Sequence, residues 1–394
     1  MSKEKLIPEF RFPEFKGEWS LEELGQCLDY LQPTPFLVDN TDYNDEYEIP
    51  VLTAGKSFIL GYTNEQEGIF NENLPVIIFD DFTTASQFVD FPFKTKSSAM
   101  KILLAKNGND IKFVYESMQT LNYEVGVHKR HWISVFSKLR IAVPKPQEQQ
   151  KIASCLSSLD EVISAHSQKL DLLKDHKKGL LQNLFPQEGE TVPKVRFPEF
   201  EGDGEWVEKE LSEVSTIITG STPSTKVPEY YGGDIMFVSP ADISNNKYVE
   251  STEKTLSLEG FEKTRKIKAN SVMFVCIGST IGKVAMNKFE CATNQQINSL
   301  VPNNENSSDF LYSNLELNAF KISGIAGNQA VPIINKTLFS SVKLKFPPTK
   351  EEQQKIASCL SAVDELITAQ QEKIEQLQQH KKGLMQGLFP KIND

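Results

Sequence analysis

Two stretches of the chain, residues 147–190 and 351–394, carry apolar side chains at alternating steps of four and three residues. In each stretch eight of the ten positions in this series are apolar, over about five heptads, which is typical of a coiled-coil seam rather than of a surface helix. Prolines before and after each series mark where the helices begin and end. The first seven positions of the two predicted seams are Ile152, Leu156, Leu159, Ile163, His166, Leu170 and Leu173, and Ile356, Leu360, Val363, Ile367, Gln370, Ile374 and Leu377.

The two predicted seams contain polar residues at the same two places. His166 in the first corresponds to Gln370 in the second, and Lys177 corresponds to Lys381. If the helices pair antiparallel with full overlap, His166 faces the apolar Ile374. Such a layer either fixes the register of the pair or is a hydrated and weaker layer, and the sequence leaves both interpretations open. The lysine stems can lie along the seam while their ammonium groups reach water.

The two stretches are copies of one another. From Glu148 and from Glu352, about 25 of 39 aligned positions are identical. A shorter repeat, RFPEF, begins at Arg11 and again at Arg196, and a tryptophan follows each copy. The segments between these repeats hardly match. A duplicated frame that carries two unlike inserts predicts a device that reads two different things at a fixed separation, and the connectivity permits either parallel or antiparallel helices.

The two inserts have the pattern of mixed α/β (α+β) domains. Short segments rich in β-branched and aromatic residues alternate with Gly, Asn, Asp and Ser, as in strands joined by turns. The predicted strands are 59–63, 75–82 and 99–106 in the first insert, and 234–238, 271–278 and 297–302 in the second. The predicted organisation is a first domain at 1–146, a helix and linker at 147–190, a second domain at 191–350 and a second helix at 351–394.

Composition narrows the classes of protein to consider. No apolar run is long enough to span a membrane and the N-terminus lacks a signal-peptide core, so we expect a cytoplasmic protein. The five cysteines form no CxxC pair and the histidines are scattered, so a metal site has little support. The formal net charge is -11, whereas a protein that binds nucleic acid alone is usually basic. DNA binding would therefore require clustered basic residues or help from a partner.

The loops of both inserts contain clusters of hydroxyl, amide and cationic side chains. These residue types contact DNA phosphates and hydrogen-bond the edges of bases. Any one cluster is more often an ordinary solvated loop, so the hypothesis rests on the set. In the first insert the candidates are Thr53, Lys56, Thr83, Thr84, Lys94, Lys96, Ser97, Ser98, Lys129, Arg130 and His131. In the second they are Ser221, Thr222, Ser224, Lys226, Ser279, Lys283, Asn294, Gln295, Gln296, Asn328 and Gln329.

Known catalytic patterns do not match this sequence. The segment LTAGKS at 52–57 lacks the spacing of a phosphate-binding GxxxxGK[ST] loop. The segment FPPT at 346–349 lacks the first and last residues of the [DNS]PP[YFW] motif of amino-methylating enzymes. Asp80 and Asp81 are adjacent, but a third metal ligand at suitable spacing is not evident. We expect no catalytic, cofactor-binding or metal-binding residues in this chain.

Over nearly its whole length the chain resembles the specificity subunit of type I restriction-modification systems. The family's two conserved regions are similar to the repeated helix motif EQQKIA…LD…I…HKKGL.Q.LFP. One type of target-recognition domain is similar to PVLTAGKSFILGYT, VIIFDDFTT and FKTKSSAMKIL in the first insert. Another type is similar to ITGSTPS…YYGGDIMFVSPADI and the GNQA region in the second. The helix motif is highly specific, whereas the insert motifs are specific only as a set.

The resemblance implies two target-recognition domains, each of which reads one half of a split, asymmetric sequence in double-stranded DNA. It also implies that the helices form an antiparallel rod that sets the gap between the halves. The chain itself would not be an enzyme. It would recruit two methyltransferase subunits, which use S-adenosylmethionine, and through them restriction subunits that use ATP and Mg. The exposed helix faces, with His176 and His380, would dock the methyltransferase subunits, and no membrane would be involved.

Two other interpretations predict different partners. A specificity subunit that serves a fused restriction-methylation enzyme would bind DNA in the same way but would assemble with a different chain. A coiled-coil scaffold with a protein-binding domain at each end would retain its partner after its loop lysines and arginines were removed.

Overall fold

The computed structural model describes residues 6–53, 57–121, 123, 131–244, 246–327 and 331–392. The chain divides into two compact units: unit 1 comprises Met1–Ala165 and Ile374–Asp394, and unit 2 comprises His166–Lys373. These units cut across the four-part division predicted from the sequence, because each long helix supplies residues to both. The C-terminal end of the chain therefore completes the first unit rather than the second.

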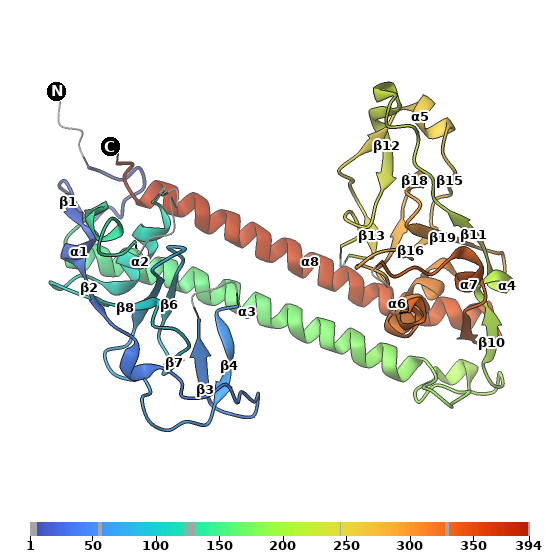
Figure 1. Cartoon of the computed structure of the whole chain (residues 1–394), viewed down its shortest axis with the longest axis horizontal. Coiled ribbons are helices and arrows are strands. Elements are labelled where there is room, and N and C mark those ends of the chain that lie inside the picture. The colour runs from blue at the N-terminus through green and yellow to red at the C-terminus, as the bar shows by residue number, and fades with distance from the viewer. Residues whose placement is uncertain are drawn as a thin grey trace. The chain divides into compact units, whose positions relative to one another are not determined.

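Unit 1 is built from short strands, two short helices and parts of the two long helices (Figure 1). Its elements are β1 (Ser20–Glu23), α1 (Leu24–Cys27), β2 (Leu28–Leu31), β3 (Ile49–Leu52), β4 (Ile59–Thr63), β5 (Val76–Asp80), β6 (Ser86–Val89), β7 (Lys94–Thr95), β8 (Met100–Ala105), α2 (Ile111–Gln119) and β9 (Arg140–Val143). The long helices are α3 (Pro146–Leu184) and α8 (Lys350–Leu388). The three strands predicted in the first insert are confirmed as β4, β5 and β8.

The strands in the described part of unit 1 form three sheets. One is antiparallel, in the order β2-β8-β5-β6, and another has the order β4-β3-β7 with β3 and β7 parallel. Strands β1 and β9 pair separately, with Ser20 opposite Val143. Because β9 leads directly into α3, this last pair joins the start of the insert to the start of the long helix.

Unit 2 also combines short strands with helices, and its helix α6 is longer than α2 of unit 1. Its elements are β10 (Val207–Glu210), α4 (Leu211–Val214), β11 (Ser215–Thr219), β12 (Tyr231–Val238), β13 (Tyr248–Val249), β14 (Thr255–Leu256), α5 (Leu258–Glu262), β15 (Lys266–Ile267), β16 (Val272–Val275), β17 (Val284–Asn287), β18 (Cys291–Thr293), β19 (Ile297–Pro302), α6 (Ser308–Ser323), α7 (Lys336–Ser340) and β20 (Lys343–Phe346). The strands predicted in the second insert are confirmed within β12, β16 and β19.

The sheets of unit 2 have the orders β11-β19-β16-β17-β13 and β14-β12-β18-β15. Strands β10 and β20 pair antiparallel, as β1 and β9 do in unit 1, and β20 leads into α8. The helix α6 packs its buried face, which includes Phe310, against these strands and against the end of α3, where the rings of Phe310 and Phe185 stack at 5.2 Å.

A buried carboxylate at the start of each long helix anchors the preceding RFPEF repeat. In unit 2, Arg196 donates two hydrogen bonds to Glu352, with Nε–Oε1 and Nη2–Oε2 distances of 2.8 and 2.7 Å. The indole Nε1 of Trp206 also donates to Glu352, at 3.2 Å. Unit 1 has the same arrangement, formed by Arg11, Trp19 and Glu148. The repeated Arg, Trp and Glu therefore form one structural motif that occurs twice.

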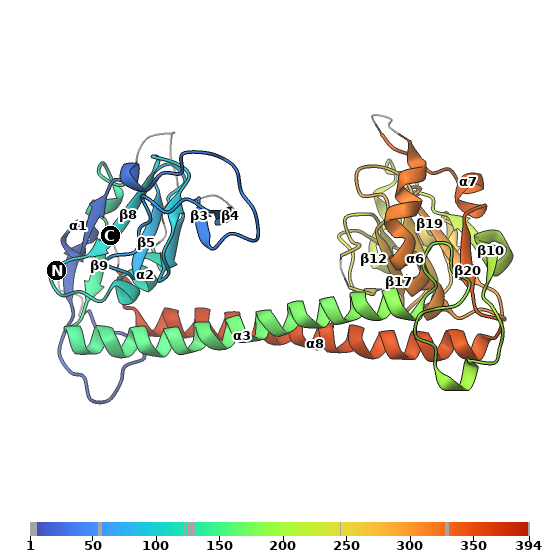
Figure 2. The ribbon, with the colours of Figure 1, turned by 90° about the horizontal axis from the view of Figure 1, so that it is seen from below.

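Within each unit, the segments of the two long helices run antiparallel and lie side by side (Figure 2). In unit 1, Lys381 near the end of α8 donates to Asp160 in the first half of α3, at 2.7 Å. In unit 2, Lys177 near the end of α3 pairs with Asp364 in the first half of α8, at 2.8 Å. These contacts select the antiparallel pairing that the connectivity had left open.

Burial along the predicted seams decreases from the start of each helix toward its middle. Ile152, Leu156, Ile356 and Leu360 are buried because they belong to the core of the domain that precedes each helix, and Val363 is buried as well. The other apolar seam residues are half-buried: Leu159, Ile163, Leu170, Leu173, Ile367, Ile374 and Leu377.

The structure corrects the partner expected for His166. Gln370 donates from Nε2 to His166 Nδ1 at 2.7 Å and to the His166 carbonyl oxygen at 2.8 Å. The two polar seam residues therefore meet one another, and His166 does not depend on an apolar residue opposite. Mutual hydrogen bonding is favoured because a buried amide or imidazole without a partner costs free energy.

Candidate nucleic-acid interface

In unit 2, four loops that are distant in the sequence meet at the ends of the strands. The loop after β11 contacts the loop after β18 through the Ser221 backbone N–H, which donates to the carbonyl of Thr293 at 2.9 Å. Gln296, in the loop after β18, donates from Nε2 to the carbonyl of Ile277 at 3.3 Å, and the neighbouring Gly278 N–H donates to the carbonyl of Pro332. Ser279, which follows Gly278, is exposed. Sequence candidates from three separate clusters are thus brought onto one surface.

A close approach of two backbones holds this surface together at Gly220. A side chain at this position would place its Cβ 2.1 Å from the carbonyl oxygen of Asn294 and 2.3 Å from that of Thr293. Only glycine permits this contact, so the sequence TGS fixes how closely the two loops pack. This glycine lies in the ITGSTPS motif, but the motif alone does not predict that two loops pack against it.

Of the three amide side chains after β18, two bond to one another and the third is exposed. Asn294 and Gln296 bond to one another, since Asn294 Nδ2 donates to Gln296 Oε1 at 2.9 Å and the Gln296 N–H donates to Asn294 Oδ1 at 3.0 Å. Their side chains shape the loop. Gln295 between them is exposed, and Thr222 donates to its Oε1 at 2.8 Å.

One cation on this surface was missed among the sequence candidates. Arg265 is exposed, its Nη1 donates to the carbonyl of Thr219 at 2.9 Å, and its backbone N–H donates to Ser221 Oγ at 2.9 Å. It follows α5, and its proximity to the residue 219–222 loop became visible only in the fold.

The remaining candidates of unit 2 differ in exposure. Ser224 and Lys226 are exposed on the loop that precedes β12. Lys283 is half-buried, and its ammonium donates to the carbonyls of Ile243 at 2.6 Å and Pro240 at 3.2 Å. These bonds tie two loops together, so Lys283 has a structural role. Asn328 and Gln329 lie outside the described residues.

In unit 1, the turn between β5 and β6 carries two candidates, Thr83 and Thr84. Asp80 accepts hydrogen bonds from the N–H groups of Phe82 and Thr83, which closes the turn. Thr84 has a φ of 60°, a conformation that is costly for a β-branched residue and that recurs at binding sites. The turn therefore presents hydroxyl groups on a strained but well-fixed backbone.

Other candidates of unit 1 lie in the segments that follow β3 and β7. Lys96 is exposed, its backbone N–H donates to the carbonyl of Leu52, and its ammonium lies 5.8 Å from the ring centroid of Tyr43. Ser98 is exposed, while Thr53 and Ser97 are half-buried. Lys56, Lys129 and Arg130 lie outside the described residues.

Asp81 is the second of the two adjacent aspartates noted in the sequence, and it is buried. Its carboxylate accepts the N–H of Trp132 at 2.8 Å and lies 3.5 Å from the ammonium of Lys101. His131, also a candidate, is buried beside it and bonds through Nδ1 to the hydroxyl of Tyr123 at 3.1 Å. Among the described residues, no cluster of three His, Cys, Asp or Glu side chains is suited to hold a metal ion.

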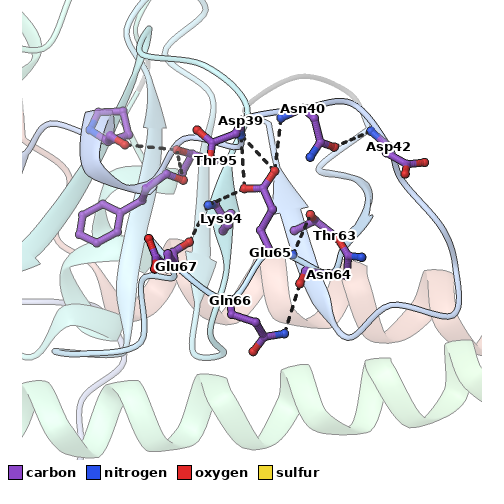
Figure 3. A network of polar contacts seen from close by, with 12 residues as sticks. Asp39, Asn40, Asp42, Thr63, Asn64, Glu65, Gln66, Glu67, Lys94 and Thr95 are labelled. Atoms are coloured by element: carbon purple, nitrogen blue, oxygen red, sulfur yellow. Dashed lines mark hydrogen bonds and ion pairs between the residues drawn. The ribbon is translucent and has the colours of Figure 1, made fainter.

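Lys94 is a structural residue rather than a surface cation, as Figure 3 shows. It is 2% exposed, and its ammonium lies 2.6 Å from Glu65 Oε2 and donates to the Glu67 carbonyl at 2.7 Å. Burial raises the pKa of Glu65, but the bonds from Lys94 and from the N–H groups of Asp39 and Asn40 outweigh burial and lower that pKa. Because this lysine is buried and paired, we remove it from the candidate DNA contacts.

The cysteines of the described structure are free thiols. Burial raises the pKa of Cys276 and of Cys291 to about 12, and burial with the nearby Glu22 raises that of Cys27 to about 12. These three thiols are therefore protonated at neutral pH and are poor nucleophiles or metal ligands. Within the described ranges, no helix is long and apolar enough to cross a membrane.

Comparison with known proteins identifies the family. The family model described as "Type I restriction modification DNA specificity domain" matches residues 17–175 and 203–379. The specificity subunit of the type I restriction enzyme EcoR124I/EcoR124II from Escherichia coli is 36% identical over 88% of this chain and 87% of its own length. The HindI specificity subunit from Haemophilus influenzae is 25% identical over 82% of this chain and 72% of its own length.

Solved structures agree on the fold. The type I restriction-modification S subunit from M. genitalium superposes with a TM-score of 0.67 at 14% identity, covering 98% of this chain and 100% of that one. A chain from a study of complex assembly and conformational transition in a type I system has a TM-score of 0.53 at 14% identity, covering 96% and 97%. Two matched domains and a relative above one-third identity over most of both chains lead to one conclusion: this chain belongs to the family of type I restriction-modification specificity subunits.

Proposed function

We propose that the chain determines the DNA sequence at which a type I restriction-modification complex acts, and that each unit binds one half of a two-part, asymmetric site. The observation that carries this proposal is that the two units share the same anchor to the long helices but have different loops. Both units contain the Arg–Glu–Trp anchor, whereas the loops of unit 1 around Thr83 and those of unit 2 around Ser221 share neither sequence nor length. Unlike surfaces on like frames favour an asymmetric, split target.

The long helices support a role in setting the gap between the two half-sites. Each spans 39 residues without interruption, and at about 1.5 Å per residue such a helix is roughly 58 Å long. This exceeds one turn of DNA, about 34–36 Å, so a split site is geometrically natural. On this proposal, changing the helix length by whole turns changes the gap and leaves the half-site sequences unchanged.

The chain performs no chemistry itself on this proposal. Methyl transfer from S-adenosylmethionine and ATP-dependent restriction belong to partner subunits, and the complex acts in the cytoplasm, with the DNA that it recognises. A chain with a net charge of -11 gains from partners that close around the DNA and share the phosphate contacts.

Repeat-equivalent positions on the helices support docking of two methyltransferase subunits. Val162 and Leu366 occupy the same place in the two copies and are 43% and 56% exposed. Large apolar side chains exposed at equivalent positions suit two copies of one partner, because each copy can meet the same local surface. His176 and His380, both exposed, lie further along the same repeats.

The test is base-resolution mapping of DNA methylation. Cells that make this chain with its cognate methyltransferase subunit are compared with cells that make the methyltransferase alone. We expect a two-part asymmetric motif that depends on the chain. An active methyltransferase that adds no motif in the presence of the chain would contradict the proposal and would favour a protein-binding scaffold.

A further inference from the structure

We propose that Arg265 and Gln295 read base edges in the half-site bound by unit 2. This inference rests on the function proposed above and deepens it, since it assigns sequence reading to two residues of one surface. Arg265 was not among the sequence candidates, and Gln295 was one of many. The hydrogen bonds around them distinguish these two from their neighbours.

Arg265 is oriented rather than free. Its Nη1 donates to the carbonyl of Thr219, and its backbone N–H is fixed by Ser221 Oγ. The edge of the guanidinium formed by Nε and Nη2 remains for a ligand. Both hydrogen bonds that Arg265 makes within the described part of the chain go to neutral oxygen atoms, so no carboxylate neutralises its charge there and the charge is available to DNA. An arginine edge with two parallel N–H donors matches the O6 and N7 acceptors of guanine.

Gln295 is oriented from the same loop. Thr222, which follows Ser221, donates to Gln295 Oε1 and thereby directs the amide of an exposed side chain. The carbonyl oxygen retains a second lone pair, and the NH₂ group retains its donors, which together suit the N6 and N7 edge of adenine. Asn294 and Gln296 bond to one another instead, so they are less suited to read bases.

The support beneath the pair is rigid. The Ser221 N–H donates to the Thr293 carbonyl, and the absence of a side chain at Gly220 lets the two loops meet within van der Waals distance. The residue 219–222 loop therefore contacts both Arg265 and Gln295. Fixed orientation favours base reading over phosphate binding, because a phosphate contact does not require the cation to be held in one orientation.

The experiment maps methylation in cells that make the cognate methyltransferase with the full chain or with each of four variants. Arg265→Ala and Gln295→Ala remove the proposed readers. Arg265→Lys keeps the charge but loses the two-donor edge. Lys343→Ala is the matched control, because Lys343 is an exposed cation of unit 2 on β20, the strand that leads into α8. Binding of the purified complex to its mapped site is measured at several salt concentrations.

We expect Arg265→Ala and Arg265→Lys to relax the motif at one base pair, and Gln295→Ala to relax it at another base pair of the same half. Discrimination at the affected position should fall by roughly tenfold or more. The other half and the Lys343→Ala motif should not change. Because both readers are exposed, the variants are expected to fold, and circular dichroism of the purified chains checks this.

Two results would overturn the inference. An unchanged motif with unchanged affinity would mean that neither residue contacts DNA. An unchanged motif with uniformly weaker binding and a shallower salt dependence would mean that Arg265 contacts phosphate. Failure of the proposed function looks different, because the unaltered chain would then give no motif at all.

Discussion

The two units differ least where the recognition domain meets the long helices and most where the loops face outward. In unit 2 the carboxylate of Glu352 binds Arg196 and Trp206, and in unit 1 Glu148 binds Arg11 and Trp19 in the same way. The loops have no such correspondence. A frame that must hold any recognition domain is constrained to keep its buried ion pairs, whereas a surface that reads a different sequence must change.

The two units also share a lysine near the end of a long helix that bonds to two carboxylates, one of which differs between the units. Lys381 bonds to Glu116 on α2 and to Asp160, and Lys177 bonds to Glu316 on α6 and to Asp364. The two lysines and the two aspartates are repeat equivalents, but the glutamates come from helices of different length in unlike inserts. Each insert has thus supplied its own carboxylate to a lysine of the frame, which ties the domain to the helix that belongs to the other repeat.

The largest expected effect comes from breaking the common anchor. Glu352→Ala leaves the guanidinium of Arg196 buried without its carboxylate, and we expect the free energy of unfolding to fall by about 3–5 kcal/mol. Fluorescence of Trp206, the adjacent donor, monitors urea unfolding of unit 2. Glu351→Ala is the control, because Glu351 is the exposed neighbour. A loss below about 1 kcal/mol would show that the anchor is not what holds the helix start.

The same change in unit 1 sharpens the comparison. Glu148→Ala removes the carboxylate from Arg11, whose side chain is more exposed than that of Arg196, at 15% against 6%. We expect a somewhat smaller loss for this reason, observed through Trp19 and Trp132 in a Trp206→Phe background. Equal sensitivity of both units to both changes would contradict independent anchors.

The next effect is confined to unit 1. Glu65→Gln removes the charge that faces the buried Lys94, and we expect a loss of about 2 kcal/mol at pH 7. The pKa of Glu65 is lowered from 4.5, so its stabilising contribution is present above that value and disappears as pH falls through the lower pKa of the folded state.

The measurement is the unfolding free energy of both proteins between pH 7 and pH 3. The difference between them should shrink below about pH 4.5, the ordinary value for this group. Glu67→Gln is the control, because only the backbone carbonyl of Glu67 contacts Lys94. A difference that does not vary with pH would show that the ionised form of Glu65 is not what matters.

A smaller effect is expected at the lysines of the frame. Burial lowers the pKa of Lys177, but the nearby Glu316 and Asp364 outweigh burial and raise it above 10.5. The stabilisation is therefore complete below pH 10.5 and is lost as pH rises through the folded-state pKa. Lys177→Met should cost about 1–2 kcal/mol at pH 8, and the cost should diminish above about pH 10.5.

The exposed neighbour Lys178 provides the control, as Lys178→Met. Unfolding of unit 2 in urea, followed at pH 8, 10 and 11.5, distinguishes the two variants. A penalty for Lys177→Met that stays constant up to pH 11.5 would assign the effect to packing of the lysine stem rather than to its charge.

The smallest effect concerns the polar layer of the seam. Gln370→Leu removes the donor from His166 and should cost about 1 kcal/mol, and adding His166→Leu should recover most of it, because both partners are then apolar. A double-mutant cycle on the free energy of unfolding gives the coupling. Additive losses would mean that the two side chains do not depend on one another and would favour the hydrated-layer interpretation.

The sequence by itself determined the frame of this protein. The seven-residue periodicity predicted both long helices, the repeat predicted a duplicated frame, and β-branched segments predicted strands such as β4 and β19. These features depend on local periodicity and on duplicated sequence, which are visible along the chain. The residue types of the loops indicated a DNA-binding class of surface but not which residues form it.

The tertiary structure decided which polar groups are buried, paired or presented. It placed Lys94 inside unit 1, turned Lys283 toward backbone carbonyls, and brought Arg265 beside the residue 219–222 loop. It also joined His166 to Gln370, although the assumed register placed an apolar residue opposite. Whether such a side chain is buried, paired or exposed depends on contacts between residues 27 to 204 positions apart in the sequence. A local sequence pattern does not contain this information.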